Sequence, residues 1–263
     1  MLSTSQIKNK LPQIKEIIDE ASVIALKYWN KGNPIVNAKK KSDGSDITEV
    51  DLAVDAIIKE GLQKLFPEET IITEESEVKT NQNLNCAWIV DPLDGTTSFI
   101  NGNDDFTTLV AYVADKVPIF GLAYFPAKNY LITAFKNEGV SAPDSFNLSK
   151  SESLREGSLY CKGFKPKENI ALAKNSPHSG AAFVEFMQGK FDAIALYDYG
   201  IWDHAPFTLM INELGGKITT NTGEPYFYLS NNPAKEFIVF SNGKDACHQN
   251  ALSLIQEKAL KIY

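Results

Sequence analysis

The sequence has few of the residues that form disulfide frameworks or zinc sites. Its 263 residues include three cysteines and three histidines. Cys86, Cys161 and Cys247 lie far apart, without a CxxC pair and without a cysteine–histidine pair at zinc spacing. We therefore expect reduced thiols in a cytoplasmic protein and no disulfide framework.

The chain also lacks a long apolar run and an excess of positive charge. No segment approaches the ~20 apolar residues that a membrane span needs, and no apolar stretch after the first lysines suggests a signal peptide. The formal net charge is -7, so neither nucleic acid nor a membrane is an expected partner. An acidic chain can still bind an anionic substrate if metal ions or backbone dipoles reverse the potential locally.

Apolar periodicity predicts an α+β fold in which helices and strands follow one another in mixed order. The helices are expected at 11–29, 48–65, 181–188, 206–214 and 245–260, and the strands at 70–73, 87–90, 107–113, 117–125, 131–135, 193–197, 217–220 and 237–241. The pattern is weakest within 136–165. We expect one domain, 1–263, with a metal-binding lobe of about 1–145 and a second lobe of about 146–263 that contributes Asp203.

The segment WIVDPLDGTTSF, residues 88–99, carries the strongest chemical signal. A buried strand that ends in Asp91 and Asp94 delivers both carboxylates to one sheet edge. Pro92 forces its predecessor into extended geometry, and the turn at Gly95 can aim backbone N–H groups at an anion. Two close carboxylates repel, which a divalent cation relieves, and oxygen ligands favour Mg²⁺, Mn²⁺ or Ca²⁺ over zinc.

Two further segments supply acids. Residues 71–76 form another strand that ends in carboxylates at Glu74, and Asp203 lies between an aromatic residue and an apolar helix. Taken alone, Asp203 is equally an N-cap, and a DPLDG segment is equally a turn built from common turn residues. Three acid-bearing segments and an anion-binding turn in one chain favour a metal site.

Together these motifs resemble the inositol monophosphatase family, within the lithium-sensitive, magnesium-dependent phosphatases. The family's D-P-[hydrophobic]-D-[GS]-[ST] signature, followed by an aromatic residue, matches 91–96 with Phe99. Its W-D, apolar helix and G-G signature matches 202–216. Its E-E strand end and V-T-x-x-D element correspond to 74–76 and 47–51, so all four motifs occur in order.

The resemblance covers roughly residues 39 to 225 and implies a layered αβαβα sandwich of the inositol monophosphatase and fructose-1,6-bisphosphatase type. It implies Mg²⁺-dependent hydrolysis of a small phosphate monoester, lithium sensitivity, two to three Mg²⁺ ions and a homodimer. The metal ligands that it implies are Glu74, Asp91, the Leu93 carbonyl oxygen, Asp94 and Asp203. The catalytic residues that it implies are Asp51, Thr96 and Glu74, of which the first two orient and deprotonate the attacking water.

The resemblance also implies the contacts of the substrate. The phosphate would lie on Gly95, Thr96 and Thr97, with Lys40 on a nearby metal-binding loop. An acid that holds substrate hydroxyls in animal members is replaced here by Leu196, with Asp198 two residues later as its substitute. We therefore expect weak discrimination among small phosphorylated polyols. No metal role is expected for His204.

Four functions are compatible with these residues. The first is hydrolysis of an inositol 1-phosphate-like monoester. The second is a 3′(2′),5′-bisphosphate nucleotidase of the same superfamily, although that branch reads D-G-T-K-E-F where this chain has GTTSF at 95–99. The third is a histidinol-phosphate phosphatase. The fourth, from another class, is a non-catalytic regulatory protein with the same fold, which retention of every expected acid disfavours.

Overall fold

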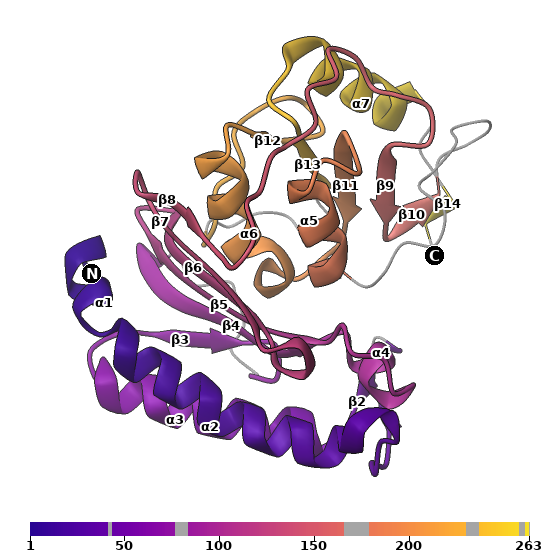
Figure 1. The fold of residues 1–263 in the computed structure, drawn as a ribbon. Helices are drawn as coiled ribbons and strands as arrows, with labels where there is room; N and C mark the ends of the chain where they lie inside the picture. The colour runs from indigo at the N-terminus through magenta and orange to yellow at the C-terminus, as the bar shows by residue number, and fades with distance from the viewer. Residues whose placement is uncertain (42–43, 77–83, 166–178, 230–236, 258–260, 263) are drawn as a thin grey trace.

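Two sheets alternate with helices in the computed structural model, which describes residues 1–41, 44–76, 84–165, 179–229, 237–257 and 261–262 (Figure 1). The first sheet contains β3 (Ile71–Thr73), β4 (Cys86–Asp94), β5 (Thr107–Ala114), β6 (Val117–Phe125), β7 (Tyr130–Phe135) and β8 (Gly139–Ser141). The second contains β9 (Leu159–Lys162), β11 (Ala193–Tyr197), β12 (Lys217–Thr220) and β13 (Phe237–Ser241). Two short pairs are β1 (Lys39–Lys40) with β2 (Asp46–Ile47), and β10 (Phe164–Lys165) with β14 (Lys261–Ile262).

The helices differ in length and position. They are α1 (Thr4–Asn9), α2 (Leu11–Trp29), α3 (Glu49–Leu65), α4 (Thr96–Ile100), α5 (Ser179–Met187), α6 (Ile201–Glu213) and α7 (Asp245–Glu257), with 3₁₀ turns at Asn30–Gly32 and Pro126–Lys128. None of the helices in these described ranges is long and apolar enough to cross a bilayer.

The six-stranded sheet is covered by helices on both faces. Its order is β3-β4-β5-β6-β7-β8, with β3 parallel to β4 and every other neighbour antiparallel. Every residue of β5 is buried. Val110 and Tyr112 pack in the core that includes α2 and α3, whereas Leu109 packs in the core that includes α5 and α6. Because side chains alternate along a strand, a strand buried on both faces is continuously apolar.

The first helical layer is the pair α2 and α3. In α2 the buried residues Ile14, Ile18, Ala21 and Ala25 follow helical spacing and form the stripe that faces the core. Thr48 caps α3 in a capping box with Asp51, so this acid is held at the start of the helix. The predicted helices at 11–29 and 48–65 are confirmed.

The second sheet has the order β12-β13-β11-β9, with β9 parallel to β11. One side of it packs on α5 and α6, and the other on α7. Since α6 also contacts β4, β5, β6 and β7 of the first sheet, the middle helices separate the two sheets (Figure 1). The layers are therefore helices, sheet, helices, sheet and helix, and the expected αβαβα sandwich is confirmed.

The prediction for the start of α6 was wrong. We expected a helix from Pro206, but α6 begins at Ile201 and carries the proline inside. Asp203 therefore lies in the first turn of the helix, where the N-terminal dipole favours a negative charge. The α6 backbone at Pro206 lies so close to the sheet that a Cβ on Gly121 would meet its carbonyl oxygen at 2.8 Å. Glycine permits this close packing.

The remaining helices and strands either match a predicted element or were not predicted. All the predicted strands are present, and β4 continues through both of its acids to Asp94. Helix α1 and strands β8 and β9 were not predicted, because they are short or weakly patterned. The predicted last helix ends at Glu257, and the rest of its expected span, 258–260, lies outside the described residues. The expected boundary between lobes near residue 145 stays a prediction.

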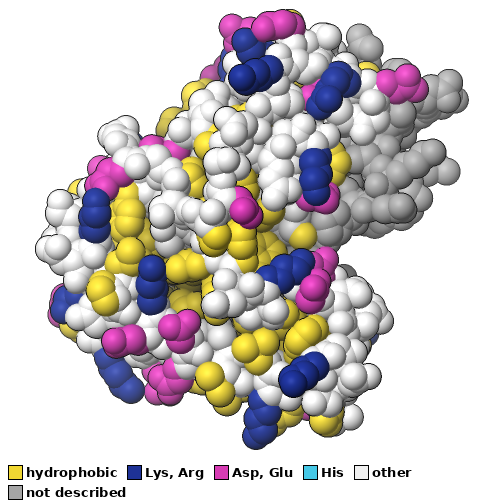
Figure 2. All heavy atoms as spheres, in the orientation of Figure 1, with side chains coloured by type: hydrophobic (Ala, Val, Ile, Leu, Met, Phe, Trp, Pro, Cys, Tyr) yellow, Lys and Arg dark blue, Asp and Glu magenta, His cyan; other side chains and the backbone are white. Residues whose placement is uncertain are grey.

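Charged side chains are dispersed over the face shown in Figure 2. Lysine and arginine side chains lie singly among acidic, apolar and other groups and form no broad cationic patch on this face.

Candidate metal centre

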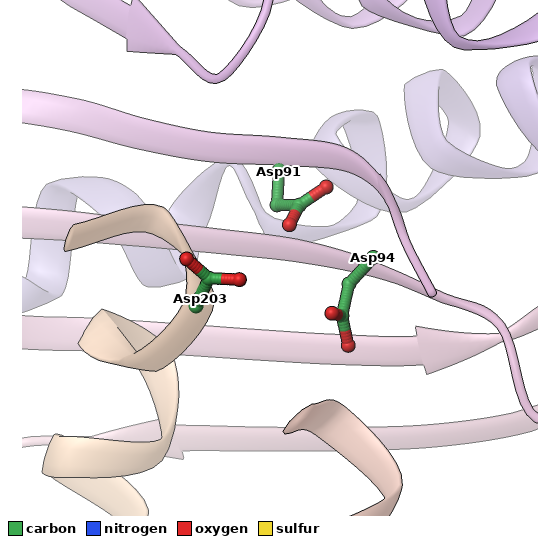
Figure 3. A group of neighbouring side chains, drawn as sticks. All are labelled: Asp91, Asp94 and Asp203. Carbon is green, nitrogen blue, oxygen red and sulfur yellow. The ribbon is translucent and has the colours of Figure 1, made fainter. Parts of the chain in front are cut away.

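Three carboxylates meet where the first sheet faces the middle helices. Asp91, Asp94 and Asp203 each offer an oxygen atom, and these atoms all lie within 4.8 Å of one another. Figure 3 shows the side chains of Asp91 and Asp94 from the end of β4 turned toward that of Asp203 from the first turn of α6. The site therefore joins two segments more than a hundred residues apart in the chain.

A bulge in β4 places its two acids on the same face. Residues three apart on a regular strand point to opposite faces of a sheet. Here Asp91 pairs with Leu109 and Asp94 pairs with Thr107, so two residues of β4 oppose one residue of β5 between these pairs. Such a bulge changes the direction of the following side chains, and it accommodates Pro92, which cannot donate to the ladder.

Glu74 approaches the same place from the neighbouring strand. Its backbone N–H donates to the carbonyl oxygen of Val90 at 3.0 Å, directly before Asp91. Its carboxylate accepts from Lys41 Nζ at 2.8 Å, and Lys41 Nζ also donates to Glu75 at 2.7 Å. Burial lowers the pKa of Lys41, but its contacts with Glu74 and Glu75 outweigh burial and raise that pKa. Lys41 therefore stays charged beside the acids.

The acids of the cluster destabilise one another's charge. Burial, and then the charges of Glu74, Asp94 and Asp203, raise the pKa of Asp91 well above its ordinary value. Burial, and then Asp94 and Glu74, raise the pKa of Asp203 as well. A group of mutually repelling carboxylates that offers only oxygen atoms fits a hard divalent cation such as Mg²⁺, which removes the repulsion.

This arrangement predicts an unusual pH dependence of stability in the presence of a chelator. Burial raises the pKa of Glu75 to about 7, although Lys41 opposes the shift. Between about 4.5 and 7 the unfolded chain has then released a proton that the folded chain keeps, so stability falls as pH rises through this window. His204 contributes with the opposite sign, because burial lowers its pKa. The contribution of Glu75 is therefore measured as a difference between the wild type and a Glu75 variant in how Tm changes from pH 5 to pH 7.5, in thermal unfolding with excess chelator.

Relative to the wild type, the Tm of Glu75→Gln should rise from pH 5 to pH 7.5, because the variant lacks the group whose raised pKa causes the loss of stability. Glu60→Gln on the exposed side of α3 is the matched control and should behave as the wild type. An equal change in Tm between pH 5 and pH 7.5 in the wild type and in Glu75→Gln would contradict the assignment.

A hydroxyl–carboxylate pair lies beside the cluster. The Thr96 hydroxyl donates to Asp51 Oδ1 at 2.9 Å and lies 3.2 Å from the carbonyl oxygen of Leu93. The other oxygen of Asp51 accepts from the backbone N–H of Thr48 at 2.8 Å. Burial raises the pKa of Asp51, while hydrogen bonds from Thr48 and Thr96 oppose the shift. A buried carboxylate that accepts a hydroxyl hydrogen bond is suited to proton transfer.

The expected phosphate contacts form a turn after β4. Gly95 adopts a left-handed conformation with φ 85° and begins α4, and Thr96 and Thr97 follow in its first turn. The first N–H groups of a helix lack partners within the helix. The Thr97 hydroxyl donates to Asp46 at 3.0 Å, which links this turn to β2.

The structure directs Lys41, and not Lys40, to the acids. Lys40 and Asp46 stand opposite each other in the β1–β2 pair and form an ion pair of 2.7 Å, and the Lys40 side chain is 66% exposed. Neighbouring residues of an extended chain point to opposite sides. Lys41 therefore turns the other way, toward Glu74 and Glu75.

Leu196 does not border the site. Its side chain is 1% exposed and packs in the core between the second sheet, α5 and α6. Leu196 therefore fills the core and does not itself line the site. Asp198 lies exposed in the turn before α6, with φ 57°.

Besides Lys41 and Glu75, four residues in the described part of the chain interact with the acids and were not assigned to the site from the sequence. The backbone N–H of Gly180 at the start of α5 donates to Asp94 Oδ2 at 2.8 Å, and a Cβ at this position would lie 2.4 Å from that oxygen. The other three residues are Tyr160, Lys162 and Tyr199 from the second half of the chain. Only the small-residue turn at Gly180 carried a sequence signal.

These three side chains interact electrostatically with the acids of the cluster. Burial, and then the charges of Asp94 and Asp203 among others, raise the pKa of Tyr160 and that of Tyr199. The charge of Lys162 acts on Asp203 in the opposite direction and lowers its pKa. The second half of the chain therefore brings two phenols and an ammonium group to the acids.

His204 has a structural environment. It is 1% exposed, and its Nδ1 lies 2.6 Å from the Tyr228 hydroxyl, which also lies 2.6 Å from Thr208 Oγ1. Burial lowers the pKa of His204 to about 3, so the ring is neutral. Its ring nitrogen is engaged with a tyrosine, so His204 anchors the start of α6.

Comparison with known proteins agrees with this geometry. The model of the inositol monophosphatase family matches residues 10–257. The 3′(2′),5′-bisphosphate nucleotidase CysQ of Buchnera aphidicola is 30% identical over 230 residues, covering 82% of this chain and 86% of the relative. The fructose-1,6-bisphosphatase/inositol-1-monophosphatase of Thermotoga maritima is 28% identical, covering 88% and 89% of the two chains.

A solved structure shows the same fold. It is described as an IMPase/NADP phosphatase complexed with Mg²⁺ and phosphate, and it covers 99% of this chain and 100% of its own with a TM-score of 0.79 and 20% identity. The family match spans nearly the whole chain, including every acid of the cluster. The protein belongs to the inositol monophosphatase family.

Proposed function

We propose that the protein is a cytoplasmic, homodimeric, Mg²⁺-dependent phosphatase that hydrolyses a small phosphate monoester of the inositol 1-phosphate kind. The observation that carries the proposal is the convergence of three carboxylates, Asp91, Asp94 and Asp203, beside the Thr96–Asp51 hydrogen bond. One group of residues is suited to hold cations and the other to handle a proton, as hydrolysis by an activated water requires.

The proposed ligands of two to three Mg²⁺ ions are Glu74, Asp91, the Leu93 carbonyl oxygen, Asp94 and Asp203. Bound magnesium would neutralise charge on the phosphate and make water easier to deprotonate. Lys41 contacts Oε1 of Glu74, so the other carboxylate oxygen can serve as the ligand. Gly180 would fix the orientation of Asp94 through its backbone N–H.

The chain itself positions the water and the phosphate. The Thr96 hydroxyl donates its hydrogen bond to Asp51. It would accept a proton from the attacking water while its own proton moves to the Asp51 carboxylate. Glu74 is proposed as a second catalytic group beside it. Backbone N–H groups of Gly95, Thr96 and Thr97 would hold the phosphate oxygens, since phosphoryl transfer depends mainly on positioning and charge neutralisation. Lys40 and Asp198 remain proposed contacts of the substrate.

A second candidate is the hydrolysis of a 3′(2′),5′-bisphosphate. The observation that favours it is the 30% identity with CysQ, which bears this activity in its name. Histidinol phosphate is a third candidate substrate with the same chemistry. A regulatory protein without catalysis is the alternative from another class.

A panel of monoesters tests the proposal. Inositol 1-phosphate, glycerol 2-phosphate, histidinol phosphate and adenosine 3′,5′-bisphosphate are assayed for phosphate release with Mg²⁺, in the wild type and in Asp198→Ala. We expect turnover of at least one substrate. Loss of one preference in Asp198→Ala would support its role in recognition. No release from any substrate would support the regulatory alternative.

The same assay measures the metal requirement. We expect no turnover in excess chelator and full recovery when Mg²⁺ is restored. Ca²⁺ should inhibit, because it is larger and accepts looser coordination than Mg²⁺, and millimolar Li⁺ should inhibit as the family resemblance implies. Full activity in excess chelator would contradict the mechanism.

A further inference from the structure

The first turn of α6 carries Asp203 but is weakly held by its own backbone. Gly200 occupies the N-cap of α6 and has no side chain that could accept from the free N–H groups of this turn. Pro206 lies inside the helix and lacks the N–H that would donate to the carbonyl oxygen of Trp202, four residues earlier. The position of Asp203 therefore depends on contacts between α6 and the rest of the protein.

The Tyr228 hydroxyl provides such a contact on both sides of the proline. It lies 2.6 Å from Nδ1 of His204, the neighbour of Asp203, and 2.6 Å from Oγ1 of Thr208. His204 and Thr208 are four residues apart, so they lie on the same face of the helix. Because a hydroxyl can donate one hydrogen bond and accept another, a single group joins the first turn of α6 to the next turn.

Tyr228 is itself fixed to the sheet that carries the other acids. Its backbone N–H donates to the carbonyl oxygen of Lys116, in the turn between β5 and β6, at 2.9 Å. Tyr228 is 1% exposed and packs in a core that includes Ile89 of β4 and Ala205 of α6. Ile89 lies two residues before Asp91 on β4, so their side chains point to the same face of the sheet. Tyr228 therefore links the start of α6 to the strand that carries Asp91.

We propose that Tyr228 is a positioning residue that sets the distance between Asp203 and the acids of β4. It acts through the two side chains of α6 that its hydroxyl contacts. It thereby holds the first turn of α6 where oxygen atoms of Asp91, Asp94 and Asp203 lie within 4.8 Å of one another. The proposal rests on the proposed function in one respect, since it assumes that these three acids hold Mg²⁺. Because Mg²⁺ requires closely defined ligand distances, loss of the hydroxyl weakens metal binding as well as the fold.

Titration calorimetry with Mg²⁺ alone, on the full chain stripped of metal, tests the proposal. Tyr228→Phe removes the hydroxyl and keeps the ring. Tyr112→Phe is the matched control, because Tyr112 is also buried and its hydroxyl donates to Glu69 at 2.6 Å. Tyr112 packs on the other face of the first sheet, in the core that includes α2 and α3. The Tm of each variant in excess chelator measures the loss of stability separately from metal binding.

We expect Tyr228→Phe to bind Mg²⁺ about tenfold more weakly than the wild type, the lower end of the usual effect of residues that orient metal ligands. Tyr112→Phe should lower the Tm in chelator, because a buried hydrogen bond is lost, and should bind Mg²⁺ as the wild type does. His204→Leu should weaken Mg²⁺ binding to a similar degree as Tyr228→Phe. The double variant Tyr228→Phe/His204→Leu should lose little more, since the two side chains act together. His204→Asn, whose amide can replace Nδ1, should retain most of the affinity.

Three outcomes would overturn the role of Tyr228. One is an unchanged Mg²⁺ affinity in Tyr228→Phe. Another is an equal loss of affinity in Tyr112→Phe, which would show a general effect of lost stability. The third is full additivity of Tyr228→Phe and His204→Leu. If Tyr228→Phe does not fold, equal affinities of His204→Leu and His204→Asn would overturn the proposal in its place.

The same measurements separate this proposal from the proposed function. A wild type that binds Mg²⁺ but releases phosphate from no monoester would refute the proposed function alone, because the affinities of the variants would still decide the role of Tyr228. A wild type that binds no Mg²⁺ would refute the metal site and, with it, the positioning role.

Discussion

Replacement of Asp91 by asparagine is expected to abolish phosphatase activity and leave the fold intact. Asp91 lies at the centre of the cluster, where it interacts with Glu74, Asp94 and Asp203. An amide has nearly the same volume but no negative charge to hold a cation. Metal ions contribute several kcal/mol to such reactions, so we expect turnover to fall at least ~100-fold. Phosphate release at saturating Mg²⁺ measures the effect.

The same substitution should stabilise the protein in the presence of a chelator. Removal of one charge relieves repulsion among the remaining acids, so the Tm of Asp91→Asn at pH 7.5 should exceed that of the wild type. Magnesium should then raise the Tm of the wild type and have little effect on the variant. This result separates a lost metal ligand from a disrupted fold.

Replacement of a second buried aspartate, Asp192, is a control in which the Tm should change in the opposite direction. Asp192 accepts hydrogen bonds from Arg155 Nε at 2.8 Å and from the Ser158 hydroxyl at 2.7 Å. Burial raises the pKa of Asp192, but these donors and Ser149 outweigh burial and lower that pKa to about 2. Asp192→Asn should therefore lower the Tm.

More than a tenth of wild-type activity in Asp91→Asn would show that the metal assignment is wrong.

Replacement of Thr96 by valine is expected to lower kcat by about 10²- to 10⁴-fold, the usual contribution of acid–base catalysis. Valine keeps the shape of the side chain but removes the hydroxyl that donates to Asp51 at 2.9 Å. The backbone N–H of residue 96 stays, so binding of phosphate should change little. Steady-state kinetics should show the loss in kcat, with a small change in KM.

Thr96→Ser is the matched control, because it keeps the hydroxyl and removes only a methyl group. It should retain most of the activity. The Asp51→Asn variant should lose activity to a similar degree, and the double variant Thr96→Val/Asp51→Asn should lose little more, since residues that act as a unit are not additive. Equal losses in Thr96→Ser and Thr96→Val, or fully additive losses with Asp51, would contradict a shared role.

The local sequence predicted those elements that depend on interactions between residues close together in the chain. The apolar stripe of α2, the Thr48 cap of α3 and the buried strand ending in Asp91 and Asp94 all depend on interactions within a few residues. The inclusion of Asp203 in the cluster was predicted instead from the order of several motifs and their resemblance to the family, because no local pattern relates residues about a hundred positions apart. The predicted start of α6 was wrong because a proline locally favours the first turn of a helix. In the structure Pro206 lies further inside the helix, where α6 packs on β6.

The tertiary structure alone decided which groups surround the acids. The Gly180 N–H that holds Asp94 lies 86 residues away in the sequence, and Lys162 reaches the cluster only because β9 pairs with β11. The choice of Lys41 over Lys40 depended on which of two adjacent lysines faced Asp46 across a strand pair. Local propensity carries no information on such contacts, since they arise when the middle helices pack between the two sheets. The sequence by itself thus determined the layered fold and the acids that converge, and the tertiary structure decided which other groups surround those acids.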